Sequence, residues 1–170
     1  MEYLKNKKGF TLIELIVVIG IISILSAAII AIIDPLSQFQ KANDARRKSD
    51  LSQIQKVLEQ YYQDNGRYPD YDLSSFKLKN LDGDIVDWGS SWSPYMDVLP
   101  KDPSGSRNYV YYSENGQSYW LYASLERGAK DPQACSGGVC PSLGKKSGFP
   151  IANSCGQTCN YGVSSPNVSP

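Results

Sequence analysis

The chain has 170 residues, with 17 basic and 17 acidic side chains and no histidine. This length suits one modest domain with an anchor, and the balanced charge does not indicate nucleic acid or an acidic partner. The lack of histidine excludes Ser-His-Asp and Cys-His catalysis, histidine metal ligands and a histidine pH switch.

A long apolar segment follows a short basic start. Three lysines precede Gly9, and the 24 residues of 10–33 carry a single charge, on Glu14. A helix of this length rises about 36 Å, enough to cross a bilayer core of about 30 Å. The apolar run is too long for a cleaved secretory signal, and the lysines favour a cytoplasmic N-terminus. We therefore expect residues 10–33 to form a transmembrane helix.

Glu14 is the unusual residue of this helix, one turn after Phe10. A carboxylate within a spanning helix costs about 2.5–3.5 kcal/mol on insertion scales. It could snorkel to the lipid headgroups, or it could await a positive partner on another chain. An ordinary anchor has no use for such a residue, so we favour the second interpretation.

Residues 34–66 are expected to continue as an amphipathic helix, giving about 55 helical residues in all. Asp34-Pro35 can be an N-cap followed by a first-turn proline, although proline in mid-helix would kink it. Asn65-Gly66 is a typical C-cap. An apolar stripe recurs at spacings of three and four, formed by Leu36, Phe39, Ala42, Leu51, Ile54, Val57, Leu58, Tyr61 and Tyr62.

The opposite helix face is expected to be charged and solvated. Asp44 with Lys48, and Arg46 with Asp50, are spaced for ion pairs at i,i+4. The run 46–48 could instead be a nucleic-acid or phospholipid patch, but we favour a solvated face paired with its own aspartates.

Residues 67–107 read as a loop region whose aromatic side chains pack onto the helix stripe; these are Tyr71, Phe76, Trp88, Trp92 and Tyr95. Two β-rich runs around Asn115-Gly116 then predict a hairpin over residues 108–126. In its second strand, one alternating set is expected to face the helix, namely Tyr119, Leu121, Ala123 and Leu125.

Residues 127–170 are rich in Gly, Ser, Asn and Pro, and are expected to form a tail that buries little apolar surface. The tail contains all four cysteines, Cys135, Cys140, Cys155 and Cys159. Behind an N-terminal export signal, an even number of cysteines indicates disulfides, which we favour over a four-cysteine zinc site. Three pairings are possible and remain open, with the two local pairs preferred.

The expected fold class is α+β. A long N-terminal α-helix, hydrophobic in its first half, packs against a small antiparallel β-sheet and is followed by a Cys-containing, loop-rich tail. The expected segments are a basic leader, a transmembrane helix, an amphipathic helix, a loop region, a β-hairpin and the tail, over residues 1–9, 10–33, 34–66, 67–107, 108–126 and 127–170.

The run Lys8-Gly9-Phe10-Thr11-Leu12-Ile13-Glu14, before an apolar helix, resembles the class III signal of type IV pilins and type II secretion pseudopilins. Further along, Tyr61–Pro69, Leu99-Pro100-Lys101-Asp102-Pro103 and the tyrosine-rich hairpin resemble the major, G-type pseudopilin. Two features depart from the family: there is no proline in mid-anchor, and Asp131 is followed by a Cys/Gly-rich tail. G-type pseudopilins often end in a calcium-binding Asp-Gly loop. Because a Cys/Gly-rich tail stands in its place here, we favour disulfides over calcium and expect no cofactor.

The resemblance implies that a prepilin peptidase cuts between Gly9 and Phe10 and then methylates the Phe10 amine. It implies a single-pass protein of the inner membrane with its C-terminal domain outside, which later joins an extracytoplasmic helical filament. Copies of itself, assembly-platform proteins and, before assembly, membrane lipid would be its partners. Glu14 would pair with the amine of a neighbouring Phe10.

No motif for catalysis occurs, so we expect a structural filament subunit rather than an enzyme. A type II secretion pseudopilin is the favoured interpretation. The alternatives are a surface type IV pilin for adhesion, motility or DNA uptake, and a membrane-anchored binding protein.

Overall fold

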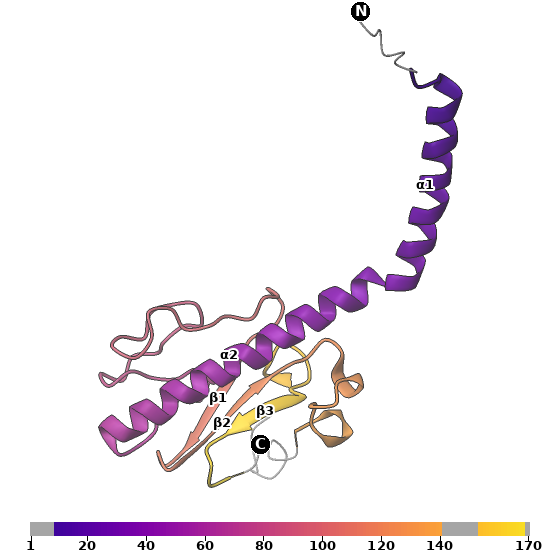
Figure 1. Ribbon diagram of the computed structural model, residues 1–170. Coiled ribbons are helices and arrows are strands. Elements are labelled where there is room, and N and C mark those ends of the chain that lie inside the picture. Colours follow the sequence, from indigo (N-terminus) through magenta and orange to yellow (C-terminus); the bar gives the residue numbers. More distant parts are fainter. Residues whose placement is uncertain (1–8, 141–152, 169–170) are drawn as a thin grey trace, which may run out of the picture. The chain divides into compact units, whose positions relative to one another are not determined.

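The computed structural model describes residues 9–140 and 153–168 (Figure 1). The chain divides into two units, residues 1–39 and 40–170, and each is described by itself. Its elements in chain order are α1 (Leu12–Ile33), α2 (Pro35–Asn65), β1 (Val110–Glu114), β2 (Ser118–Ala123), the short 3-10 turns η1 (Gly128–Lys130) and η2 (Ser136–Gly138), and β3 (Tyr161–Ser164).

Helix α1 is the apolar helix expected near the start of the chain. Thr11 caps its N-terminus, and Ser23 donates its hydroxyl to the carbonyl of Ile19 at 2.7 Å. Its stretch Leu12–Ile30 is long and apolar enough to cross a membrane, and it is the one such helix in the described part of the chain. The described side chains of α1 are all exposed within this chain.

The expected continuous helix is in fact two helices that meet at Asp34. Asp34 ends α1 in a left-handed conformation, with φ 45°, and its Oδ1 accepts the Ser37 N–H at 3.5 Å. Pro35 has no N–H to continue the bonding of α1 and its ring clashes with the preceding turn, whereas at a first helical position it causes no loss. Asp34-Pro35 therefore acts as a helix start.

Helix α2 packs through the middle of its apolar stripe. Leu51, Ile54 and Leu58 are fully buried, and Tyr61 nearly so. The stripe does not extend to the first turn, because Leu36 and Phe39 remain 67% and 70% exposed. At its other end the helix stops as expected, at Asn65 with Gly66 in a left-handed conformation.

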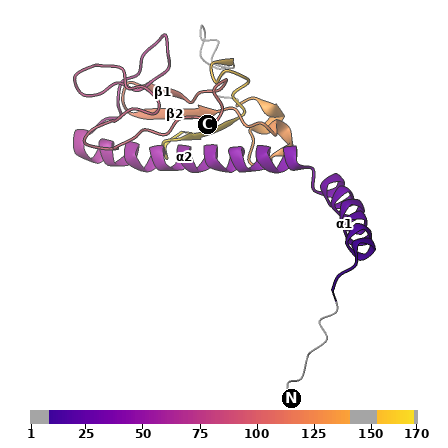
Figure 2. The ribbon, with the colours of Figure 1, turned by 90° about the horizontal axis from the view of Figure 1, so that it is seen from above.

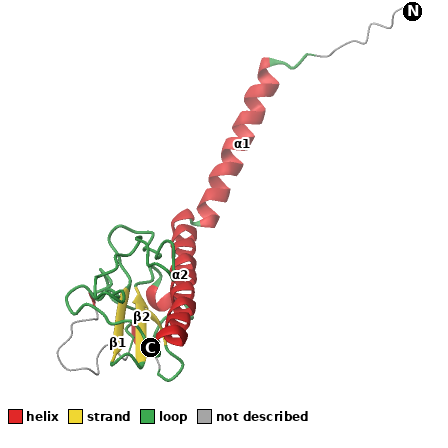
Figure 3. Cartoon of the chain, turned by 90° about the vertical axis from the view of Figure 1, so that its left-hand side faces the viewer, coloured by secondary structure: helices red, strands yellow, loops and turns green. Residues whose placement is uncertain are grey.

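The predicted hairpin is present as β1 and β2 (Figure 3), and β3 adds to β2 to give an antiparallel sheet of order β1-β2-β3 (Figure 1). Asn115 and Gly116 both have positive φ, as a tight two-residue turn requires. One face of the hairpin joins Tyr119, Leu121 and Ala123 to the buried stripe of α2, as predicted. In Figure 2, α2 lies along one side of the strands.

The second face of the sheet is also covered, which the sequence did not suggest. Val110 and Tyr122 form a cluster there with Phe76 and three fully buried cysteines, Cys140, Cys155 and Cys159. The tail also supplies β3, which pairs with β2 from Trp120↔Ser164 to Ala123↔Tyr161. The expectation that the tail buries little apolar surface is therefore wrong, as is the placement of Phe76 on the helix side.

Residues 67–107 are loop, as expected, and contain only isolated bridges such as Tyr71↔Leu78 and Lys79↔Ile85. Their aromatic side chains anchor them. Trp92 is buried and stacks on Tyr61 with ring centroids 5.6 Å apart. The loop region thus contributes to the core on the α2 side of the sheet.

Candidate functional site

The start of α1 holds the residues that the sequence singled out. Thr11 donates to Glu14 Oε2 from both its backbone N–H, at 2.9 Å, and its hydroxyl, at 2.7 Å. In return, the Glu14 N–H donates to the Thr11 hydroxyl oxygen at 3.2 Å. This reciprocal pair is a capping box, which satisfies helix N-terminal donors that have no partner inside the helix.

The capping box explains how a carboxylate can occupy an otherwise apolar helix. The N-terminal end of a helix carries a partial positive charge that favours a nearby anion. Both Thr11 donors bond to Oε2, and no bond to Oε1 occurs within residues 9–140 and 153–168. Glu14 is thus held in place while one oxygen stays open to a further donor.

Thr11 is a functional residue that the sequence reasoning missed. The signal was present, because Thr11-x-x-Glu14 matches the capping-box pattern directly before an apolar run. A charge within an apolar segment suggests a partner outside the helix, whereas the capping box gives Glu14 a partner inside it.

The apolar side chains around Glu14 have no cover within the chain. Phe10 is 86% exposed and Ile13 64%, and Val17 and Val18 are also exposed. Such a large apolar surface is stable only when lipid or other protein removes it from water.

Gly9 precedes the helix, in a segment without regular structure. A Cβ placed on Gly9 would meet nothing within 4 Å, and its φ is not in the left-handed region. The fold of this chain therefore does not require glycine there, and any need for a small residue must come from outside the chain.

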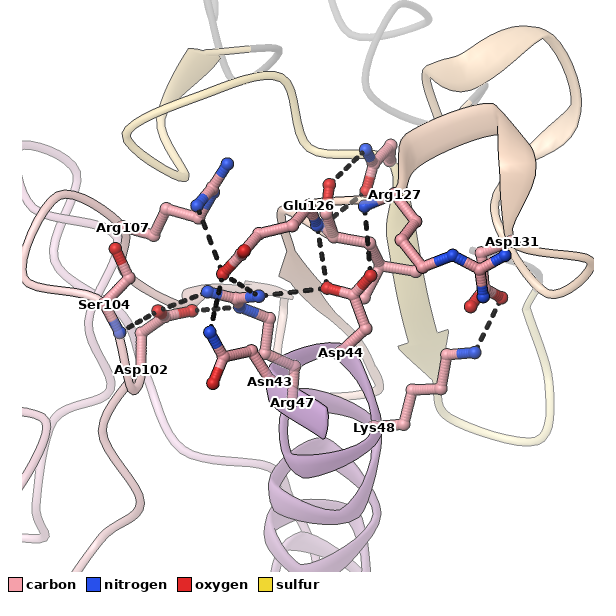
Figure 4. A network of polar contacts seen from close by, with 12 residues as sticks. Asn43, Asp44, Arg47, Lys48, Asp102, Ser104, Arg107, Glu126, Arg127 and Asp131 are labelled. Carbon is pink, nitrogen blue, oxygen red and sulfur yellow. Dashed lines mark hydrogen bonds and ion pairs between the residues drawn. The ribbon is translucent and has the colours of Figure 1, made fainter. Parts of the chain in front are cut away.

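A second group of charged residues lies in the head, residues 40–170, around Arg47 (Figure 4). Arg47 is fully buried and holds Asp102 with two parallel bonds, Nε to Oδ2 at 2.8 Å and Nη2 to Oδ1 at 2.9 Å. Its Nη1 donates to Asp44 Oδ1 and Glu126 Oε1, both at 3.0 Å. Burial disfavours the charge, but the bonds to Asp102, Glu126 and Asp44 outweigh it and raise the pKa of Arg47.

This cluster corrects the expectation of a solvated helix face. Arg47 and Asp44 point inward, and Lys48 pairs with Asp131 at 2.6 Å rather than with Asp44. Arg46 keeps the predicted partner Asp50, at a loose 4.0 Å. The cluster holds α2 against the segments that contain Asp102 and Glu126. Its carboxylates are bonded to groups of their own chain, so we assign it a structural role.

The cysteines form two local disulfides, Cys135–Cys140 and Cys155–Cys159, with Cα atoms 4.9 and 5.4 Å apart. The two loops touch, because the Cys140 N–H donates to the Cys159 carbonyl at 3.3 Å. All four sulfurs are engaged, so this arrangement offers no thiolate for zinc. Within the described ranges, no group of three Asp, Glu or Cys side chains is placed to hold a metal ion.

Comparison with known proteins supports these observations. The prokaryotic N-terminal methylation motif matches residues 4–30, and the family model of type II secretion system protein G matches residues 35–137. The described part of the second match contains α2, the loop region and the β1-β2 hairpin.

Several curated proteins are similar to the chain. The type II secretion system core protein G of Vibrio cholerae is 30% identical over 66% of this chain and 75% of its own length. That of Pseudomonas aeruginosa is 30% identical over 76% and 93%. The type IV wide pilus major component PilA4 of Thermus thermophilus is 43% identical over 49% and 63%.

No solved structure matches the chain significantly. The family match nevertheless covers more than half of the chain, in agreement with the apolar α1 and the α2-plus-sheet head. The chain therefore belongs to the type II secretion system protein G family of structural, non-enzymatic pseudopilins, and carries the N-terminal methylation motif.

Proposed function

We propose that this protein is a structural subunit of a type II secretion pseudopilus, assembled through α1. The observation that carries the proposal is Glu14, which is bonded to Thr11 at the start of a helix whose described side chains are all exposed. Before assembly the lipid of the inner membrane covers these side chains. In the filament the α1 helices of neighbouring copies replace the lipid.

Processing creates the positively charged group that pairs with the Glu14 carboxylate. Prepilin peptidase cuts between Gly9 and Phe10 on the cytoplasmic side, and the new Phe10 amine is methylated. The amine of a neighbouring copy then pairs with Glu14, whose Oε1 is open. A buried carboxylate is stable only with a hydrogen-bonded cation, so the pairing favours assembly of processed subunits over unprocessed ones.

The role of Glu14 is tested by Glu14→Ala in cells that express the secretion system. We expect normal membrane insertion and normal cleavage, but no filaments in the sheared fraction. Ser23→Ala is a matched control, because it removes another polar side chain of α1 whose hydroxyl bonds only its own helix. Filaments at the normal level from Glu14→Ala would contradict the pairing.

The cleavage site is tested by Gly9→Leu. The fold tolerates a side chain there, so only recognition by the peptidase should suffer. We expect the longer, uncut form to accumulate in the membrane. Mature protein of normal size from this variant would contradict the assignment.

A surface pilus is the second candidate function, favoured by the 43% identity to the Thermus thermophilus pilus component. Electron microscopy of cells that overproduce the protein distinguishes the two. Long surface fibres with unchanged protein secretion after deletion support the pilus. Impaired secretion without surface fibres supports the pseudopilus.

A further inference from the structure

Between residues 40 and 60 of α2, three of the five basic side chains are exposed, whereas none of the acidic side chains is. The three acidic side chains of this stretch turn toward the head: Asp44 joins the Arg47 cluster, and Asp50 accepts a tyrosine hydroxyl at 2.7 Å. Glu59 accepts two tyrosine hydroxyls, at 3.0 and 3.1 Å. The acidic charges of this stretch are therefore engaged within the head, and only Asp50 also reaches an outer cation, Arg46, at 4.0 Å.

The outer surface of the same stretch is basic, and it also holds the exposed Gln53, whose amide donates to the Ser49 hydroxyl at 3.3 Å. The cations Lys41, Arg46 and Lys56 are exposed there, and so are the small side chains between them, Ala42, Ala45, Ser49 and Ser52. We call these seven residues the basic face. Figure 2 shows the strands and the loops together on one side of α2. The seven residues of the basic face are all exposed within the chain.

The loop region carries a surface of opposite character. Leu81, Asp82, Asp84 and Ile85 are all exposed on a tight turn, which we call the acidic tip. The Lys79↔Ile85 bridge and the bond from the Gly83 N–H to the Asn80 carbonyl, at 3.1 Å, hold this turn. The tip therefore combines two carboxylates with two large apolar side chains that the head leaves uncovered.

We propose that the basic face of one subunit binds the acidic tip of a second copy in the filament. The proposal rests on the proposed function and names the contact between heads. The two surfaces differ and belong to one chain, so their contact is heterologous and can repeat without closing, as a filament needs. Ala42 and Ala45 leave room for Leu81 and Ile85 close to the helix. Lys41 and Lys56, about four helical turns apart, supply positive charge on both sides of this contact and attract Asp82 and Asp84.

Charge reversal tests the contact in the full-length protein. Lys41→Glu/Lys56→Glu and Asp82→Lys/Asp84→Lys are each expected to lower the yield of sheared filaments at least about fivefold, because like charges then meet. All four changes together restore opposite charges and should recover most of the wild-type yield. Arg46 is left unchanged because it contacts Asp50.

Controls separate this contact from folding and from net charge. Lys101→Glu/Lys130→Glu changes two other exposed lysines and should leave the yield unchanged. The level of cleaved monomer in the membrane reports folding. If a reversed variant is lost, the neutral pairs Lys41→Gln/Lys56→Gln and Asp82→Asn/Asp84→Asn replace it, each with an expected loss of about twofold and a weaker salt dependence.

The other outcomes overturn the contact. No rescue in the combined variant means that the two surfaces do not meet. If only the lysine changes lower the filament yield, and they also weaken binding of the protein to anionic membranes, then the basic face binds lipid rather than a second copy. Wild-type filaments that depend on Glu14 would persist in either case, so these results do not bear on the proposed function. Failure of the wild type to form filaments would contradict that function itself.

Discussion

Helices α1 and α2 handle charge in opposite ways. In α1 the described side chains are mostly apolar and all exposed, and the single carboxylate is held by Thr11 only three residues away. In α2 the acidic side chains and Arg47 turn inward and bond to residues far along the chain, such as Asp102. The stability of α1 therefore depends on what surrounds the chain, whereas that of α2 depends on the chain itself.

This difference implies that variants which affect the stability of the head can be told apart from variants which affect assembly. Changes in α2 should lower the free energy of unfolding of the head, and changes in α1 should alter assembly while leaving that free energy unchanged. The full-length protein in detergent, unfolded by urea and followed by near-UV circular dichroism, measures the first quantity.

The largest effect is expected for Arg47→Met. It leaves the carboxylates of Asp44, Asp102 and Glu126 without their buried cation, which costs about 3–5 kcal/mol in unfolding free energy. Arg46→Met is the matched control, because Arg46 is 64% exposed and should change stability by less than about 1 kcal/mol. Similar effects of the two variants would contradict an inward role for Arg47.

Tyr109→Phe should cost about 1.5–3 kcal/mol, because it removes the hydroxyl that donates to Asp50 at 2.7 Å. Burial, followed by the bond to Asp50, raises the pKa of Tyr109 above its usual value. An unfolded tyrosine loses its proton near pH 10, so the contribution is complete below about pH 10 and declines as the pH rises further. Urea titrations from pH 8 to 11 should show a smaller decline in Tyr109→Phe than in the control Tyr62→Phe.

The disulfides should contribute less, about 2 kcal/mol each, because they close short loops. Cys155→Ala/Cys159→Ala should destabilise the head more than Cys135→Ala/Cys140→Ala. The reason is that both cysteines of the second disulfide are fully buried, whereas Cys135 is only partly so. The reverse order in urea unfolding would show that the buried cysteine cluster adds little to the head.

Glu14→Ala should change the unfolding free energy of the head by less than about 0.5 kcal/mol, despite its effect on filaments. The bonds of Glu14 all lie within α1. The same urea titration measures this, with Arg47→Met as the positive control. A clear loss of head stability would mean that the two helices do not divide assembly and stability as stated.

Local patterns predicted the elements whose stability has local causes. The apolar run predicted α1, the Asn115-Gly116 pair predicted the hairpin turn, and the spacing of Leu51, Ile54 and Leu58 predicted the buried side of α2. In each case the periodicity or the turn chemistry is contained in a few consecutive residues.

The predictions that were wrong concern contacts between residues that lie far apart in the sequence. Tyr161–Ser164 is only four residues long within a tail rich in Gly, Ser and Asn, and it becomes β3 because β2 offers a free edge. Spacing along α2 suggested that Lys48 pairs with Asp44, but the buried guanidinium of Arg47 and two backbone N–H groups occupy that carboxylate. At the candidate site, the sequence motif was enough to single out Glu14. Only the structure shows that both Thr11 donors bond to Oε2 and leave Oε1 open.

Strand β3 has a consequence for the order in which the head can form. β2 is the middle strand, and one of its edges stays open until the chain supplies Tyr161–Ser164 after the intervening residues 124–160. Both cysteine pairs precede β3 along the chain. A chain that emerges from its N-terminus therefore presents α1, the hairpin and all four cysteines before the strand that completes the sheet.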